Sequence, residues 1–188
     1  MAAWALIRGD KGEGKTSQAR AVAARLRERG IRVGGFVQQA VQETDGTRVG
    51  YDLARIAGGT PIPLARRGKV PQAGQVGFCS HVFEPSAFVQ AREWLREEAP
   101  SAEVLIIDEV SRLETASQGH AAAVRFALAL PATRVVVLCI RAEQLFAVTE
   151  AFLGDSAGEA VATLEAAAGE DALAQFAEAV IRAVREGG

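Results

Sequence analysis

The sequence has few cysteines, little net charge and no long apolar run, and each shortage narrows the class of protein. Only two of the 188 residues are cysteines. Cys79 and Cys139 lie far apart without CxxC spacing, which argues against a zinc site and a disulfide framework and fits a reducing cytoplasm. No stretch reaches the roughly 20 apolar residues of a membrane span. The formal net charge is −2, so we expect neither nucleic acid nor an anionic membrane as a partner.

Lysine is also scarce, and its few positions are informative. The chain has only Lys11, Lys15 and Lys69, while every other cation is an arginine. Two of the three lysines lie in one stretch, GDKGEGKT, at residues 9–16. Lysine carries a compact ammonium on a flexible stem, whereas arginine carries a wide planar fork. Either the two lysines occur together by chance, or this stretch needs the smaller group.

The composition and the apolar pattern favour one α/β domain over residues 1–188. Apolar residues make up 49% of the chain, enough for a full-sized core. Continuous apolar runs predict buried strands over 3–8, 31–38, 103–108 and 134–140. The first run lacks a basic flank and a cleavage site, so we expect a strand and not a signal peptide. Buried strands separated by helices predict a mostly parallel sheet with helices on both faces.

Helical periodicity and turn residues predict the remaining elements. Helices are expected from the end of the GDKGEGKT stretch to Gly30, over 86–98, near 118–130, near 142–153 and over 173–184, with a short strand at 161–164. Asp45-Gly46 tolerates positive φ between two extended segments, which predicts a β-hairpin insertion over 41–53. Residues 57–80 are rich in Gly, Pro and Arg, and we expect a lid or inserted loop there.

GDKGEGKT matches the phosphate-loop pattern G-x-x-x-x-G-K-[ST] at every fixed position, between a predicted strand and a predicted helix. Glycines permit the tight turn, and the loop amides and the helix N-terminus then surround a phosphate. Lys15 can reach the β- and γ-phosphates, and the Thr16 hydroxyl can ligate Mg²⁺. The alternative is a glycine-rich turn without a ligand. The expected nucleotide-binding residues are Asp10, Lys11, Gly12, Glu13, Gly14, Lys15, Thr16 and Ser17.

A second motif, VLIIDE at residues 104–109, ends a buried strand with two acids. Asp108 would then lie at the carboxyl edge of the sheet, where it can hold Mg²⁺ through water. Glu109 follows it and is placed to orient or deprotonate a water that attacks the γ-phosphate. The alternative is a solvated pair of acids at a strand end. Beside a phosphate loop, the pair favours hydrolysis of a nucleoside triphosphate over binding alone.

Arginines supply weaker candidates. Arg141 follows the strand over 134–140, and it would emerge near the γ-phosphate if that strand lies beside the Asp108 strand. There it would be a catalytic cation; otherwise it is an arginine at a helix start. Arg66, Arg67 and Lys69 either close over the triphosphate, reach a neighbouring subunit, or form a solvated basic loop. His81 and His120 have no partner pattern, and we assign them no role.

Several stretches together resemble the small P-loop nucleoside-triphosphatases related to the cancer-related nucleoside-triphosphatase. The matching stretches are GDKGEGKT, GGFVQQ (34–39), DGTRVGYDL (45–53) and IIDEVSRLE (106–114). The resemblance implies a P-loop three-layer sandwich with a RecA-like or AAA-like core and slow, Mg²⁺-dependent hydrolysis of several nucleoside triphosphates, ATP among them. Gln38, Gln39, Ser111 and Arg112 depart from the family pattern, which leaves the substrate preference open.

Three functions follow from these motifs. The first is a nucleoside-triphosphate hydrolase that uses Lys15, Glu109 and Arg141 in catalysis and Thr16 and Asp108 for the metal. The second is a small-molecule or nucleoside kinase, and the third is a nucleotide-dependent switch or adaptor. The chain has no NKxD guanine motif, and a protein partner or an oligomer is compatible with the sequence without being identified by it.

Overall fold

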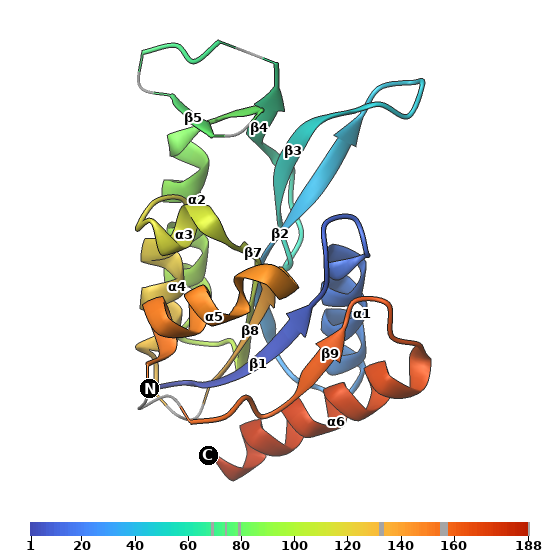
Figure 1. The fold of residues 1–188 in the computed structure, drawn as a ribbon. Helices are drawn as coiled ribbons and strands as arrows, with labels where there is room; N and C mark the ends of the chain where they lie inside the picture. The colour runs from blue at the N-terminus through green and yellow to red at the C-terminus, as the bar shows by residue number, and fades with distance from the viewer. Residues whose placement is uncertain (69, 74, 79, 132–133, 155–157, 188) are drawn as a thin grey trace.

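The computed structural model describes residues 1–68, 70–73, 75–78, 80–131, 134–154 and 158–187 (Figure 1). Within these residues the chain forms a mixed α/β fold around one nine-stranded sheet in the order β5-β6-β4-β3-β2-β7-β8-β1-β9. The strands are β1 (Ala3–Arg8), β2 (Val33–Gln42), β3 (Arg48–Arg55), β4 (Ile62–Arg67), β5 (Val76–Phe78), β6 (His81–Phe83), β7 (Val104–Val110), β8 (Val135–Ile140) and β9 (Thr163–Glu165).

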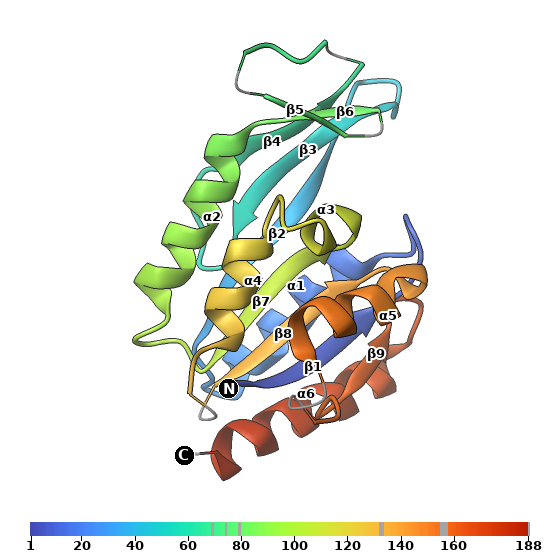
Figure 2. The same cartoon turned by 60° about the vertical axis from the view of Figure 1, so that its left-hand side comes forward.

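The sheet has two parts of different character. Strands β2, β7, β8, β1 and β9 pair in parallel and form what we call the parallel half. Strands β3, β4, β6 and β5 continue from β2 by antiparallel pairing and form the antiparallel half. Figure 2 shows the antiparallel half extending away from the last helix, at the other end of the molecule.

Helices cover both faces of the sheet and bury one core on each side. They are α1 (Lys15–Glu28), α2 (Pro85–Glu98), α3 (Arg112–Thr115), α4 (Ala121–Leu128), η1 (Ala142–Gln144), α5 (Leu145–Val148), η2 (Thr149–Leu153) and α6 (Glu170–Glu186). One core joins the apolar stripes of α1 and α6 to the sheet, and the other joins those of α2 and α4 to the opposite face. Strand β8 lies between both cores and is buried at all six positions, which explains its unbroken Val, Leu and Ile sequence.

The predicted β-hairpin is confirmed, because β2 and β3 pair antiparallel around Asp45-Gly46, where Gly46 has a φ of 83°. β2 is longer than expected and continues to Gln42, since it pairs with β7 at its beginning and with β3 further along. The last helix is also confirmed, and α6 starts at Glu170.

The expectation of an irregular loop over residues 57–80 was wrong, whereas a lid formed by this insertion stays a prediction. This stretch contains β4 and β5, which join the sheet through β3 and β6. β5 has only three residues, too few for a visible alternation, and the prolines and glycines within and around the two strands hid their pairing. Residues 142–153 were expected to form one helix. The chain instead forms η1, α5 and η2 in succession there. Likewise, the expected helix near 118–130 is confined to α4, preceded by the short α3.

The described residues contain no helix that is long and apolar enough to cross a membrane. Cys139 is a buried free thiol in β8, and the second cysteine, Cys79, lies outside the described residues.

Candidate functional site

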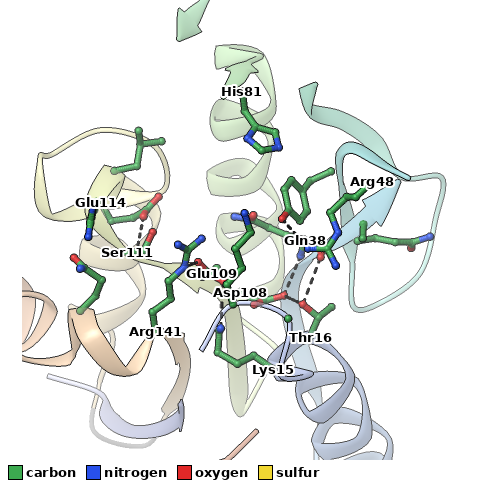
Figure 3. A pocket seen from close by; sticks show the side chains of 18 of the residues that line it. Lys15, Thr16, Gln38, Arg48, His81, Asp108, Glu109, Ser111, Glu114 and Arg141 are labelled. Atoms are coloured by element: carbon green, nitrogen blue, oxygen red, sulfur yellow. Dashed lines mark hydrogen bonds and ion pairs between the residues drawn. The ribbon is translucent and has the colours of Figure 1, made fainter. Parts of the chain in front are cut away.

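A cleft of about 550 Å³ opens where the parallel strands end, over the loop between β1 and α1 (Figure 3). Its walls come from that loop, from β2, β3, β5, β6 and α2, from the end of β7, and from the segments that follow β7 and β8. The carboxyl ends of parallel strands are where α/β folds bind ligands, because loops there bring together side chains from several strands. The chemistry of this cleft therefore depends on which side chains those loops supply.

Glycines allow the loop of residues 9–16 to fold tightly at the start of α1. Gly12 and Gly14 have φ values of 89° and 100°, a region that side chains with a Cβ rarely adopt. Gly9 is required for a different reason, because a Cβ at this position would come within 2.6 Å of the Cβ of Ala166. The segment after β9 thus presses against the loop and holds its shape.

Lys15 is buried in the first turn of α1, and its ammonium lies over the loop. Its Nζ donates to the carbonyl oxygens of Gly9 and Asp10 at 3.0 and 2.9 Å, and it lies 3.5 Å from Glu109 Oε2. Only 5% of the residue is exposed. An ammonium held by loop carbonyls and one carboxylate is ready to exchange these partners for the oxygens of a phosphate.

Thr16 and Asp108 meet at the bottom of the cleft. Thr16 Oγ1 donates to Asp108 Oδ2 at 2.7 Å, and the backbone amide of Gln38 donates to the same oxygen at 3.1 Å. Asp108 is 1% exposed, and burial raises the pKa of its carboxyl to about 6 while the bond from Thr16 acts in the opposite direction. No described lysine or arginine forms an ion pair with it, so a cation beside this carboxylate would be stabilising.

The donor set fits a hard divalent cation. One carboxylate and one hydroxyl oxygen lie together, and oxygen ligands are what Mg²⁺ prefers. The described residues contain no group of three or more His, Cys, Asp or Glu side chains that could hold a metal by themselves. Such a cation would therefore complete its shell with water and phosphate oxygens, which is the usual state of Mg²⁺ in nucleotide sites.

Glu109 stands between two cations. Its Oε1 accepts a bond of 2.6 Å from Arg141 Nε, and its Oε2 faces Lys15. Strands β7 and β8 pair in parallel with Asp108 opposite Cys139, which brings Arg141 beside the Asp108 strand as the sequence analysis required. The three side chains form one chain of charges across the cleft (Figure 3).

The remaining loop residues take different positions. Lys11 and Ser17 are exposed and line the cleft. Glu13 Oε2 accepts a bond of 2.6 Å from the Asp10 amide, so this carboxylate closes the loop internally. The Asp10 amide is consequently engaged within the protein, in contrast to a phosphate-binding amide.

Comparison with known proteins places the chain in a family. A family model described as NTPase matches residues 5–160. The chain belongs to this NTPase family. It is 32% identical to the human cancer-related nucleoside-triphosphatase over 145 residues, which cover 72% of this chain and 74% of that protein. It is 35% identical to nucleoside-triphosphatase THEP1 of Pyrobaculum aerophilum over 108 residues, 57% of each chain.

The fold is shared with a solved structure. The solution structure of a human cancer-related nucleoside triphosphatase superimposes with a TM-score of 0.69 at 23% identity and covers 100% of both chains. This likeness establishes the mixed α/β architecture around the cleft described above.

In this NTPase, several residues to which the sequence assigned no part in the site lie in the cleft. Gln38 lies at the site through its backbone, because its amide bonds Asp108 and its carbonyl lies 3.4 Å from Thr16 Oγ1. Arg48, Tyr51 and His81 also line the cleft, from β3 and β6. The sequence signals were the GGFVQQ match, which includes Gln38, and the DGTRVGYDL match, which includes Arg48 and Tyr51, and neither assigned these residues a place.

Arg66 and the second histidine have partners within the fold. Arg66 pairs with Asp52 at 2.6 Å and donates to the Tyr51 carbonyl, so it fastens β4 to β3. Lys69 lies outside the described residues. His120 is 1% exposed, and its ring packs against Phe36 with 4.6 Å between centroids.

Proposed function

We propose that this member of the NTPase family cleaves the β–γ phosphoanhydride bond of nucleoside triphosphates with Mg²⁺, on a P-loop three-layer sandwich. One observation carries the proposal: Asp108 and Glu109 end the β7 strand directly above the glycine loop, one bonded to Thr16 and the other facing Lys15. A site that only bound nucleotide would need the loop and the metal ligand, but it would have no use for the second acid.

Thr16 and Asp108 would hold Mg²⁺ in this proposal. When bound, the ion neutralises the developing charge on the β- and γ-phosphate oxygens. The hydroxyl and the carboxylate are already in contact at 2.7 Å, so little rearrangement is needed to present both oxygens to one cation. Mg²⁺ would also remove the cost of keeping the Asp108 carboxylate charged in a buried place.

Glu109 is the proposed general base. It accepts a proton from a water whose oxygen attacks the γ-phosphorus, and the bond from that phosphorus to the β–γ bridging oxygen breaks. The products are a nucleoside diphosphate and inorganic phosphate. Arg141 and Lys15 both contact Glu109 in the structure. Arrival of the phosphates would draw both cations toward the phosphate oxygens, which frees the carboxylate to orient the water.

A second hollow of about 370 Å³ supports broad base specificity. It lies on the other side of the first turn of α1, between that helix and the segment after β9, and it shares Gly14 and Ser17 with the main cleft. Much of its wall is alanine and glycine, and the Gln18 side chain donates to the carbonyls of Ala166 and Ala168. We place the nucleobase here, where few side chains are available to distinguish one base from another.

The test is phosphate release from ATP, GTP, CTP and UTP with Mg²⁺, comparing the wild type with Glu109→Gln. The amide retains the shape of the side chain but cannot accept the proton, so we expect release to fall by about 10²-fold or more. Nucleotide binding should survive. Glu143→Gln is the matched control, because Glu143 also lines the cleft and loses the same charge, yet has no assigned part in the reaction. The control should remain within about threefold of the wild type.

Other outcomes separate the alternative functions. If the triphosphate is consumed only when an acceptor is added, the protein is a kinase and the hydrolase assignment fails. Tight binding without turnover, relieved by another protein, would replace it with a nucleotide-dependent switch. Equal turnover in Glu109→Gln and the wild type would remove Glu109 from its assigned role.

A further inference from the structure

One wall of the cleft is an aromatic chamber, formed by Tyr51, Phe78, His81, Phe83 and Phe88. These residues come from β3, β5, β6 and α2, and each is half-buried. The centroids of Tyr51 and His81 lie 5.5 Å apart, and those of Phe83 and Phe88 lie 5.8 Å apart. Figure 3 shows His81 pointing into the cleft from the side opposite Lys15. Half-exposed rings in a cleft offer flat apolar surface to a ligand.

Cations surround this chamber. The pKa of His81 is lowered first by burial and then by the positive charges of Lys11, Arg67 and Arg48. Arg48 lines the cleft with its guanidinium 5.8 Å from the centre of the Tyr51 ring, and its Nη1 lies 3.3 Å from the Tyr51 hydroxyl. Its Nε is buried and has no hydrogen-bond partner among the described residues. An unpaired donor beside several positive charges is suited to an anionic group.

A buried acid completes the wall. Glu114 is 3% exposed and lines the cleft, although both of its oxygens accept bonds from backbone amides, one from Ser111 and one from His120. Burial raises the pKa of its carboxyl to about 7. This side chain closes the first turn of α3, and its remaining lone pairs can accept from a donor on a ligand.

The proposed nucleoside triphosphate leaves this chamber empty. Its phosphates lie at the loop, and the hollow proposed for its base lies on the opposite side of α1. We infer that the aromatic chamber is a second ligand site, which takes a small molecule with a planar ring and an anionic group while the phosphate loop holds the triphosphate. The inference rests on the proposed function only for the position of the triphosphate. Nucleoside monophosphates and simple aromatic phosphates share the required chemistry.

The single tyrosine of the chain gives a direct readout, because Tyr51 lies in the chamber. Full-length protein labelled with fluorotyrosine should give one fluorine resonance. We would saturate it with Mg²⁺ and a non-hydrolysable triphosphate analogue, and then titrate AMP, GMP, CMP, UMP or phenyl phosphate. We expect the resonance to shift and saturate while the analogue stays bound. Tighter binding of the monophosphates would identify a nucleotide ligand, and equal binding of phenyl phosphate would identify aromatic phosphates in general.

Two ligands that each carry only one of the two required groups, together with three protein variants, test the assignment further. Adenosine lacks the anionic phosphate, and ribose 5-phosphate lacks the planar base. Each should therefore bind at least about tenfold more weakly than AMP. Arg48→Ala and His81→Ala should each weaken AMP by a similar factor, whereas Arg182→Ala, an exposed arginine on α6, should not. All three should release phosphate from the triphosphate at the wild-type rate, which separates a failure of this site from a failure of the hydrolase.

Three results would overturn the second site. In the first, none of the probes shifts the tyrosine resonance at millimolar concentration. In the second, the probes displace the triphosphate analogue and therefore compete for the phosphate loop. In the third, AMP binds Arg48→Ala, His81→Ala and Arg182→Ala equally well, although all three variants have the wild-type melting temperature.

Discussion

The two halves of the sheet differ in how they combine stability with chemistry. In the parallel half the central strands β7 and β8 are almost entirely buried, and the polar groups Asp108 and Arg141 lie at or just after their carboxyl ends, beside Lys15 of α1. In the antiparallel half the strands are shorter or half-exposed, and arginine and aromatic side chains lie within the strands themselves. The first arrangement fixes a few groups in position, whereas the second presents a broad surface. This difference matches a reaction site on one side of the cleft and a ligand-binding surface on the other.

The largest expected effect lies at the phosphate loop of the parallel half. Lys15→Ala removes an ammonium that is bonded to the Gly9 and Asp10 carbonyls and faces Glu109. We expect phosphate release to fall by about 10³-fold, because the charge that develops on the phosphate oxygens loses a direct partner. The measurement is steady-state phosphate release with each nucleoside triphosphate.

The matched variant is Lys15→Arg, which retains the charge but replaces a compact ammonium by a wide fork in a buried place. It should not restore activity. Turnover of Lys15→Ala within tenfold of the wild type would mean that the parallel half does not carry the reaction, and the contrast between the halves would fail.

The next effect concerns stability and compares one glycine from the parallel strands with one from the hairpin turn. Gly35 lies opposite Ile106, and a Cβ on it would collide with the Ile106 carbonyl oxygen. Gly46 also has positive φ, but a Cβ there would meet nothing within 4 Å. We expect Gly35→Ala to lower the free energy of unfolding by about 3 kcal/mol or more, and Gly46→Ala by about 1 kcal/mol. Urea unfolding of both variants measures the difference.

Equal losses in the two glycine variants would contradict this view. Both losses in the free energy of unfolding would then come from the left-handed backbone alone. The close approach of β2 and β7 at Gly35 would add nothing to the cost of a Cβ there.

The smallest effect is a pH dependence where α3 meets α4 beside the parallel half. Burial raises the pKa of the Glu114 carboxyl from 4.5 to about 7, so its contribution to stability is present at low pH and is lost as the pH rises through 7. Burial lowers the pKa of His120 from 6.5 to about 3, so its contribution is present above 6.5 and is lost as the pH falls toward 3. Between pH 5 and pH 7 the two slopes oppose each other and nearly cancel.

Glu114→Gln removes the first slope and retains one acceptor oxygen, which can serve either the Ser111 or the His120 amide. Its free energy of unfolding should therefore rise by about 2 kcal/mol relative to the wild type between pH 5 and pH 7. Urea unfolding at the two pH values checks the sign. Parallel curves for the variant and the wild type would show that Glu114 does not titrate in this range, and Glu143→Gln, an exposed acid, should give such parallel curves.

The sequence predicted the parallel half far better than the antiparallel half. The GDKGEGKT stretch carries the whole pattern of the proposed phosphate loop in eight consecutive residues, and the VLIIDE stretch marks both a strand and the acids near its end. Arg141 was a conditional candidate, and the pairing of β7 with β8 met the condition. β5 and β6 have three residues each, which is too short to show a period of two, so the chamber that they help to form was invisible in the sequence.

What the sequence by itself determined is local: the tight glycine turn before α1, the apolar runs of the buried strands and the acids that end β7. Each depends on backbone freedom or on side-chain burial within a few residues, and each can therefore be recognised from a short sequence motif. The tertiary structure decided which distant residues meet. Arg141 reaches Glu109 through the register of β7 and β8, and Tyr51 faces His81 because β4 lies between β3 and β6 in the sheet. Such meetings follow from strand order and register, which are set by the packing of the whole chain and not by any one segment.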